Sequence, residues 1–264
     1  MKITFIGLGN MASAMLNGIL TNRIIPQENI IGTDISPLIR NNAKNNYGIN
    51  IADDNQTACI GADIIILAIK PQVSESVLAE IKESISAQTI VLSIMAGKTI
   101  AWLSDKLTKT VKIIRAMPNT PALVGEAISG VCRNSLVNDE EMENCLNLLA
   151  SFGKAEEIPE TLIDAVIGVS GSAPAYVFIF IEALADAAVA AGMPRAQAYR
   201  FAAQNVYGSA KLVLETGKHP GELKDMVCSP GGTTIEAVKI LEERGFRSAV
   251  IGAAEAAIAK SKKL

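Results

Sequence analysis

Short apolar runs alternate with longer amphipathic stretches along the first part of the chain. Runs rich in β-branched residues predict strands at 2–6, 29–35, 62–69, 89–94 and 111–117. The run at 62–69 shows no alternation of polar and apolar positions, which is typical of parallel strands buried on both faces. Apolar residues spaced by three and four positions predict helices after residue 10, over 72–86 and over 102–107. This order of elements predicts an α/β fold with a doubly wound parallel sheet.

Beyond residue 159 the pattern becomes helical throughout. Alanine-rich segments with helical periodicity lie at 162–192, 195–216, 234–244 and 246–260, separated by turns that contain glycine or proline. The sequence therefore predicts two domains, one over 1–159 that contains the sheet and an all-helical one over 160–264. Because the helices of the second domain are apolar on more than one face, we expect it to form a homodimer whose interface resembles a core cut in half.

Composition bears on the cellular compartment. The chain has 264 residues, of which 49% are hydrophobic, and a mean hydropathy of +0.30. Its longest apolar stretch, 173–192, is interrupted by Glu182 and Asp186, whereas about 18 uninterrupted apolar residues are needed to span a bilayer. The N-terminal segment lacks the hydrophobic region of a signal peptide, and the four cysteines form no CxxC pair. We therefore expect a cytoplasmic protein without a membrane partner, a zinc knot or a disulfide framework.

Charge and histidine content disfavour further classes of function. Lysine and arginine total 24 against 27 for aspartate and glutamate, and only 4% of the residues are aromatic. We expect no nucleic-acid partner, because such proteins use excess positive charge and aromatic rings. His219 is the only histidine, which disfavours Ser-His-Asp hydrolysis and zinc chemistry. No metal is expected.

A glycine-rich loop follows the first predicted strand and precedes a helix. Its pattern, Gly7-x-Gly9-x-x-Ala12, lets the backbone approach a pyrophosphate at the helix N-terminus. Asp34 stands 22 positions beyond Ala12, after the second predicted strand, where the ribose hydroxyls of a dinucleotide would lie. These features predict a Rossmann-type dinucleotide-binding domain. The Asp34 carboxylate favours NADH, but Ser36 and Arg40 could partly support the 2′-phosphate of NADPH, so the preference stays open.

Five segments distributed over nearly the whole chain carry more specific motifs. They are 5–11 (FIGLGNM), 67–72 (LAIKPQ), 115–122 (RAMPNTPA), 170–176 (SGSAPAY) and 223–234 (LKDMVCSPGGTT). Together they resemble the pyrroline-5-carboxylate reductase family. The resemblance implies an oxidoreductase that transfers a hydride from NADPH or NADH to 1-pyrroline-5-carboxylate and forms L-proline, the last step of proline biosynthesis. It also implies a homodimer, with dimers stacked into a larger ring such as a decamer.

The glycine loop and this resemblance together indicate the site residues. Cofactor contacts are expected from Ile6, Gly7, Leu8, Gly9, Asn10, Met11, Asp34, Ser36, Asn55, Ala68, Ile69, Lys70, Pro71, Ala96 and Glu160. Substrate contacts are expected from Met95, Ser229, Gly231, Gly232, Thr233 and Thr234. The resemblance makes Thr234 the catalytic residue, with its hydroxyl by the imine nitrogen. Family members commonly carry a polar amide where this chain has Met226, so a substrate contact through that side chain is absent or replaced.

Several of these residues also have plainer interpretations. Backbone N–H groups of the turn at 229–232 can bind a carboxylate ahead of a helix, but Thr233 and Glu236 also have the spacing of a capping box. Lys70 either orients the cofactor or is a surface lysine. Asn119 is either a turn former or a cleft residue. His219 precedes Pro-Gly and is more typical of a turn than of a general base.

Two other functions are compatible with the same glycine loop. A β-hydroxyacid dehydrogenase has a similar loop and a helical second domain, but its catalytic lysine has no counterpart in 168–182. A non-catalytic NAD(P)-binding sensor would bind the nucleotide without oxidising it. Carbonyl reduction requires a proton donor for the developing alkoxide. A protonated cyclic imine is already cationic, so the lack of a catalytic histidine is no obstacle to its reduction.

Overall fold

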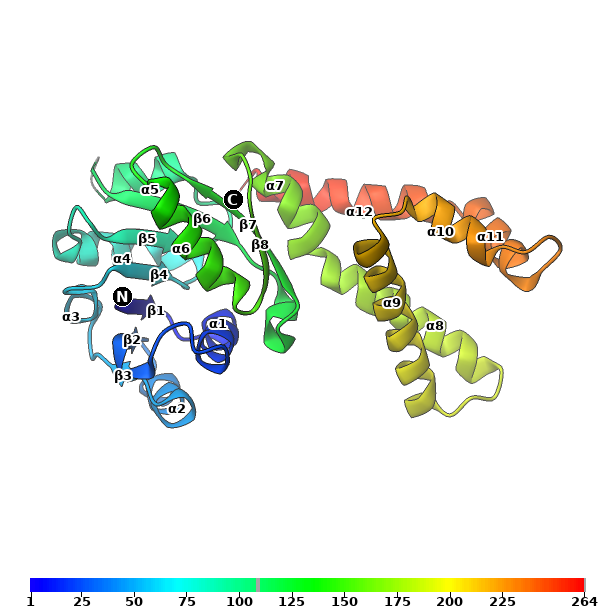
Figure 1. Ribbon diagram of the computed structural model, residues 1–264, viewed down its shortest axis with the longest axis horizontal. Helices are drawn as coiled ribbons and strands as arrows, with labels where there is room; N and C mark the ends of the chain where they lie inside the picture. Colours follow the sequence, from blue (N-terminus) through cyan, green and yellow to red (C-terminus); the bar gives the residue numbers. More distant parts are fainter. Residues whose placement is uncertain (108–109, 264) are drawn as a thin grey trace. The chain divides into compact units, whose positions relative to one another are not determined.

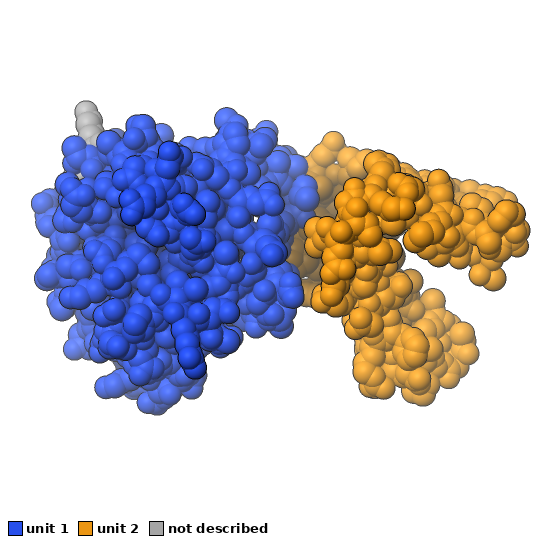
Figure 2. All heavy atoms as spheres, in the orientation of Figure 1, with its two compact units in different colours: residues 1–171, 257–264 blue, residues 172–256 orange. Residues whose placement is uncertain are grey.

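The computed structural model describes residues 1–107 and 110–263 and confirms an α/β sheet followed by helices (Figure 1). The chain forms two compact units, which Figure 2 shows in different colours. Unit 1 comprises Met1–Gly171 and Ala257–Leu264, and unit 2 comprises Ser172–Ala256. The domain boundary at 159/160 stays a prediction, and the last residue of that predicted domain, 264, lies outside the described residues.

Unit 1 is built on an eight-stranded sheet with the strand order β3-β2-β1-β4-β5-β6-β7-β8. The strands are β1 (Ile3–Ile6), β2 (Ile30–Thr33), β3 (Asn50–Ile51), β4 (Ile64–Leu67), β5 (Ile90–Ser93), β6 (Lys112–Met117), β7 (Ala127–Arg133) and β8 (Gly153–Glu157). Neighbouring strands pair in parallel, except β6 and β7, which are antiparallel. The chain order reverses beside β1, so β1 and β4 flank the crevice where doubly wound folds bind their ligands.

The centre of the sheet forms the core of unit 1. All residues of β1, β4 and β5 are buried, as the unbroken apolar run at 62–69 predicted for β4. Phe5 and Leu92 belong to one buried cluster, and Ile65 and Val91 belong to a second. Burying a side chain of this size contributes about 1.5–3 kcal/mol. The sheet is therefore a rigid support for the loops that leave its carboxyl edge.

Helices and short turns connect these strands. The helices of unit 1 are α1 (Asn10–Thr21), α2 (Pro37–Tyr47), α3 (Asn55–Cys59), α4 (Ser74–Ile81), α5 (Ile100–Lys106), α6 (Asp139–Ala150) and α7 (Ile163–Val166). The predicted helix over 72–86 is shorter in the structure, because 3-10 turns at Pro71–Val73 and Lys82–Ser84 flank α4. Helices α2, α3 and α6 were not predicted from the sequence.

Unit 2 consists of helices. They are α8 (Ala173–Ala190), α9 (Arg195–Thr216), α10 (Pro220–Val227), α11 (Thr233–Glu243) and most of α12 (Phe246–Ser261). The single helix predicted over 162–192 is interrupted by a π-helical turn at Ile167–Gly171. The helical run Glu160–Ala190 is long and apolar enough to cross a bilayer by length and composition, a test that core helices of soluble proteins also pass.

Candidate functional site

The loop between β1 and α1 has the geometry of a dinucleotide-binding turn. Gly7 has φ +89°, and a Cβ at this position would lie 2.6 Å from the carbonyl oxygen of Ala68, so only glycine fits. Gly9 caps α1 without a side-chain hydrogen bond, and a Cβ built on it would meet no described atom within 4 Å. The first N–H groups of α1 therefore remain available to a phosphate.

The other predicted residues of the glycine loop have different structural roles. Ile6 and Leu8 are 2% and 3% exposed, and Met11 packs partly against the core. Their side chains therefore fix the loop on the sheet, and ligand contacts from Ile6 and Leu8 would have to come chiefly from the main chain. Asn10 is exposed at the first position of α1, where its side chain can reach a bound ligand.

Asp34 connects the end of β2 to the glycine loop. Its Oδ2 accepts a hydrogen bond from the N–H of Leu8 at 2.9 Å, and its Oδ1 accepts one from the N–H of Ser36 at 2.9 Å. Arg40 donates through Nη1 to the main-chain oxygen of Asp34 at 2.7 Å, and its Nη2 lies 3.8 Å from Asp53. Arg40 is thus already engaged by acceptors of this chain, whereas the Asp34 carboxylate keeps lone pairs for the ribose hydroxyls.

A cavity of about 410 Å³ lies beside Asp34. It is lined by Ile6, Gly7, Thr33, Asp34, Ile35, Asp54, Asn55, Ile69, Val73, Ser76, Val77 and Glu80. The charged members of this lining are all carboxylates, and Asn55 donates to Glu80 at 2.8 Å. Hydrogen bonds from the N–H and hydroxyl of Thr57 lower the pKa of Asp54, so this group is ionised at neutral pH. The acidic lining suits hydroxyl donors and opposes a phosphate.

Further predicted residues lie on the loops that follow β4 and β5. Ile69 lines the cavity, and the exposed Lys70 precedes the turn Pro71–Val73. Met95 is 1% exposed within the core, and Ala96 packs partly against the buried cluster of Met117, Cys132 and Ile163. Loops at the carboxyl ends of neighbouring parallel strands leave the same edge of the sheet, so these residues surround the edge where the glycine loop lies.

Glu160 begins the 3-10 turn Glu160–Leu162, which follows β8. Its Oε1 accepts hydrogen bonds from Nη1 of Arg115 at 3.0 Å and from the N–H of Ile100 at 2.8 Å. The carboxylate therefore joins β6 to the start of α5. Glu160 was predicted as a cofactor contact, but its bonds to Arg115 and Ile100 were not predicted.

In unit 2 the segment 229–232 forms a tight turn ahead of α11. Gly231 has φ +68°, and the N–H of Gly232 donates to the main-chain oxygen of Ser229 at 3.0 Å. The positive φ of Gly231 favours glycine, whereas a Cβ on Gly232 would require the Ser229 hydroxyl to rotate away. Thr233 and Thr234 are the first residues of α11, where N–H groups have no intrahelical acceptor. The turn can therefore bind a carboxylate with the Thr234 hydroxyl nearby.

The capping-box interpretation of this segment is wrong. Thr233 is already inside α11, and the cap is Gly232, which has no side chain to accept a hydrogen bond. His219 does cap a helix: its Nδ1 accepts from the N–H of Gly221 at 3.0 Å at the start of α10. This bond occupies the basic nitrogen and agrees with the turn interpretation of His219.

For Asn119 the structure supports the turn interpretation, and the cleft interpretation stays a prediction. It is 8% exposed, its Oδ1 accepts from the N–H of Ile128 at 3.0 Å, and its Nδ2 donates to the main-chain oxygen of Ser170 at 3.2 Å. The side chain thus supports the turn after β6 and also satisfies a carbonyl of the π-helical turn, whose hydrogen bonding is irregular.

Both ends of the chain match known protein families. Residues 160–264 match a family model described as pyrroline-5-carboxylate reductase dimerisation, and residues 2–97 match one described as NADP oxidoreductase, coenzyme F420-dependent. Pyrroline-5-carboxylate reductase of Escherichia coli (strain K12) is 54% identical over 264 residues, which cover 100% of this chain and 98% of that protein. The Methanosarcina acetivorans enzyme of the same name is 43% identical, with 100% and 97% covered.

A solved structure of the same enzyme class is also similar to this chain. The crystal structure of Plasmodium falciparum pyrroline carboxylate reductase with NADP bound superposes with a TM-score of 0.90 at 36% identity, covering 99% of this chain and 97% of that one. The largely parallel sheet, the glycine loop and the cavity beside Asp34 have the form of a dinucleotide-binding domain, and the family matches make the chain an oxidoreductase. The two reductases above match this chain over nearly their full length. The chain belongs to the pyrroline-5-carboxylate reductase family, as its five motifs predicted.

Proposed function

We propose that this protein reduces 1-pyrroline-5-carboxylate to L-proline with NADH or NADPH. The observation that carries the proposal is the 54% identity to a pyrroline-5-carboxylate reductase over the whole chain. The glycine loop supports it, because Gly7 permits the tight turn and Gly9 leaves room for a pyrophosphate at the start of α1. The turn at 229–232 supports it as well, because it offers N–H donors to a small carboxylate.

NAD(P)H, when bound, supplies the hydride. In this proposal the glycine loop and the N-terminus of α1 hold the pyrophosphate, and Asp34 accepts hydrogen bonds from the ribose. The remaining cofactor contacts are Ile6, Leu8, Asn10, Met11, Ser36, Asn55, Ala68, Ile69, Lys70, Pro71, Ala96 and Glu160. These residues fix the nucleotide rather than activate it, and orientation of the reacting groups supplies most of the rate.

Unit 2 binds the substrate in the same proposal. Ser229, Gly231, Gly232 and Thr233 hold the carboxylate, and Met95 of unit 1 contributes to the substrate contacts. Thr234 is the catalytic residue, and its hydroxyl holds or passes the proton at the imine nitrogen. Because hydride addition to a protonated imine cancels a charge, no side chain has to stabilise an alkoxide.

We further propose that the protein is a cytoplasmic homo-oligomer built from dimers, which stack into a larger ring such as a decamer. The match of residues 160–264 to a dimerisation domain supports the dimer. So do the exposed apolar side chains of unit 2, among them Ile179 at 67% and Phe201 at 62%. Light scattering coupled to size exclusion tests the ring: a species of dimer mass at every concentration would contradict it.

One assay tests the function against its alternatives. Loss of absorbance at the nicotinamide band is followed with NADH and then NADPH, using the cyclic imine and a panel of β-hydroxyacid oxidation products. We expect the enzyme to oxidise the cofactor when the cyclic imine is the substrate and not when a compound of the panel is the substrate. Activity only with the panel would favour a β-hydroxyacid dehydrogenase. Binding of the nucleotide without oxidation by any of these compounds would favour a sensor.

A further inference from the structure

Arg115 is a charged residue in the interior of unit 1. It lies on β6, and its side chain is 4% exposed. Removing a guanidinium from water is costly unless a carboxylate and hydrogen bonds compensate. Its recorded partner is Glu160, 45 residues further along the chain, at 3.0 Å from Nη1. Because burying the Arg115 guanidinium costs desolvation free energy, its ion pair with Glu160 is a candidate for a role in function.

The partner of Arg115 has a second contact. Oε1 of Glu160 also accepts the N–H of Ile100 at 2.8 Å. Ile100 is the first residue of α5, so this N–H has no acceptor within its own helix. Both bonds go to Oε1, which leaves Oε2 as the oxygen that can face a ligand, and the side chain is 32% exposed.

Residues 94–99 form the loop that joins β5 to α5, and Ile100 directly follows this loop. The beginning of this loop is held by the N–H of Ile94, which donates to the main-chain oxygen of Leu67 at 3.3 Å. Its end is held by Glu160. Ala96 and Ile100 also pack against the cluster that contains Cys132. The loop that carries Met95 and Ala96 is therefore fixed at both ends, and one of these ends depends on Arg115.

We propose that Arg115 is a positioning residue for hydride transfer, acting through Glu160 on the loop that carries Met95 and Ala96. The inference rests on the proposed function. Arg115 contributes one bond to this carboxylate, through Nη1, and the N–H of Ile100 contributes the other, so the position of Oε1 depends on both. A displacement of reacting groups by about 1 Å can cost about 10²-fold in rate, so loosening the loop lowers the rate of the chemical step.

Single-turnover kinetics test the proposal, with NADH equimolar to the enzyme, both well above the Kd, and saturating cyclic imine. The rate constant of the first turnover reports the chemical step, whereas its amplitude reports the fraction of competent enzyme. Arg115→Lys and Glu160→Gln are expected to lower the rate constant about 10- to 100-fold and to retain most of the amplitude. The double variant should be no slower than the slower single variant, because both act through one contact.

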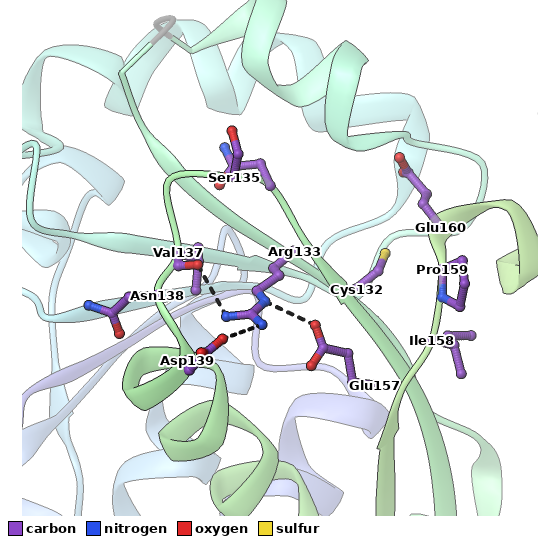
Figure 3. A pocket seen from close by; sticks show the side chains of 11 residues that line it. Cys132, Arg133, Ser135, Val137, Asn138, Asp139, Glu157, Ile158, Pro159 and Glu160 are labelled. Carbon is purple, nitrogen blue, oxygen red and sulfur yellow. Dashed lines mark hydrogen bonds and ion pairs between the residues drawn. The ribbon is translucent and has the colours of Figure 1, made fainter.

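A neighbouring ion pair provides matched controls. Arg133 on β7 donates to Glu157 on β8 at 2.9 Å and to Asp139, as Figure 3 shows, with Glu160 and Cys132 on another side of the same pocket. Arg133→Lys and Glu157→Gln should leave the rate constant unchanged. The proposal is overturned if the Arg115 and Glu160 variants lose amplitude only, or keep the wild-type rate constant. Absence of hydride transfer in the wild type would instead overturn the proposed function.

Discussion

Unit 1 and unit 2 differ in how much of their apolar surface a single chain buries. In unit 1 the strands β1, β4 and β5 consist of buried residues, and large side chains such as Phe5 and Phe152 are fully enclosed. In the described part of unit 2, the buried apolar residues are three alanines and one leucine: Ala185, Ala198, Ala202 and Leu223. Many of its larger apolar side chains are exposed, including Leu214 at 83%.

This difference indicates that unit 1 is complete within one chain, whereas unit 2 requires a partner to cover its apolar surface. The hydrogen bonds that shape the glycine loop and Asp34 come from unit 1 of the same chain, so we expect one chain to suffice for the proposed nucleotide site. Unit 2 carries the turn proposed to bind the substrate and leaves apolar faces that resemble one half of an obligate interface. We expect nucleotide binding to survive changes that abolish activity through unit 2, and the following predictions test this separation.

The largest effect is expected from a charge on an exposed apolar face of unit 2. Phe201→Glu on α9 should separate the subunits and lower activity by more than about 100-fold, because a buried unpaired carboxylate costs several kcal/mol at an interface. Light scattering and the oxidation assay measure the two effects. Ile60→Glu, at a 69% exposed position of unit 1, is the control and should change neither. A fully active oligomer carrying Phe201→Glu would contradict the comparison.

Removal of one hydroxyl gives the next largest effect. Thr234→Ala should lower kcat about 10²-fold, the scale of a lost proton-transfer group, while the Kd for NADH measured by fluorescence changes little. Thr233→Ala is the neighbouring control and should affect KM more than kcat. If Thr234→Ala keeps the wild-type kcat, the catalytic assignment is wrong.

The preference between NADH and NADPH should change on substitution of a residue of unit 1. Asp34→Ser removes the carboxylate that we propose binds the ribose and is expected to shift the ratio of kcat/KM for NADPH over NADH upward by at least about tenfold, which corresponds to about 1.4 kcal/mol. Arg40 stays bound to the main-chain oxygen at position 34 and limits the gain. An unchanged ratio would show that Asp34 does not discriminate the two nucleotides.

Thiol reactivity gives the smallest and most local test. Burial raises the pKa of Cys59, Cys132 and Cys145 in unit 1 to about 12, so these groups stay protonated and unreactive at pH 8. Cys228 in unit 2 is only partly buried. A native titration with a chromogenic disulfide should therefore detect at most one thiol, and the unfolded protein should give four. Rapid reaction of two or more would contradict the enclosed core of unit 1.

The sequence predicted the parts of the fold whose signal is local. Five strands were predicted because unbroken or β-branched apolar runs mark them, and α9 covers the predicted segment 195–216. β8 was missed because its sequence, GKAEE, has almost no apolar residues. The π-helical turn Ile167–Gly171 was missed because apolar spacing does not distinguish it from an α-helix.

The candidate site shows the same limit. Gly7, Gly9 and Asp34 were predicted because their spacing follows from the geometry of one strand–helix–strand unit. The carboxylates of Asp54 and Glu80 reach the same cavity from the N-cap of α3 and from α4, and Arg115 reaches Glu160 across 45 residues. Such contacts depend on how the elements pack, and no local pattern in one sequence encodes them.

The central claim is that this chain transfers a hydride directly from its bound nucleotide to the cyclic imine. NADH deuterated at both C4 positions is mixed with the enzyme and 1-pyrroline-5-carboxylate, and the proline formed is analysed by mass spectrometry. We predict proline that carries one deuterium, at the carbon that was doubly bonded to nitrogen. Proline without deuterium, or no proline at all, would contradict the account.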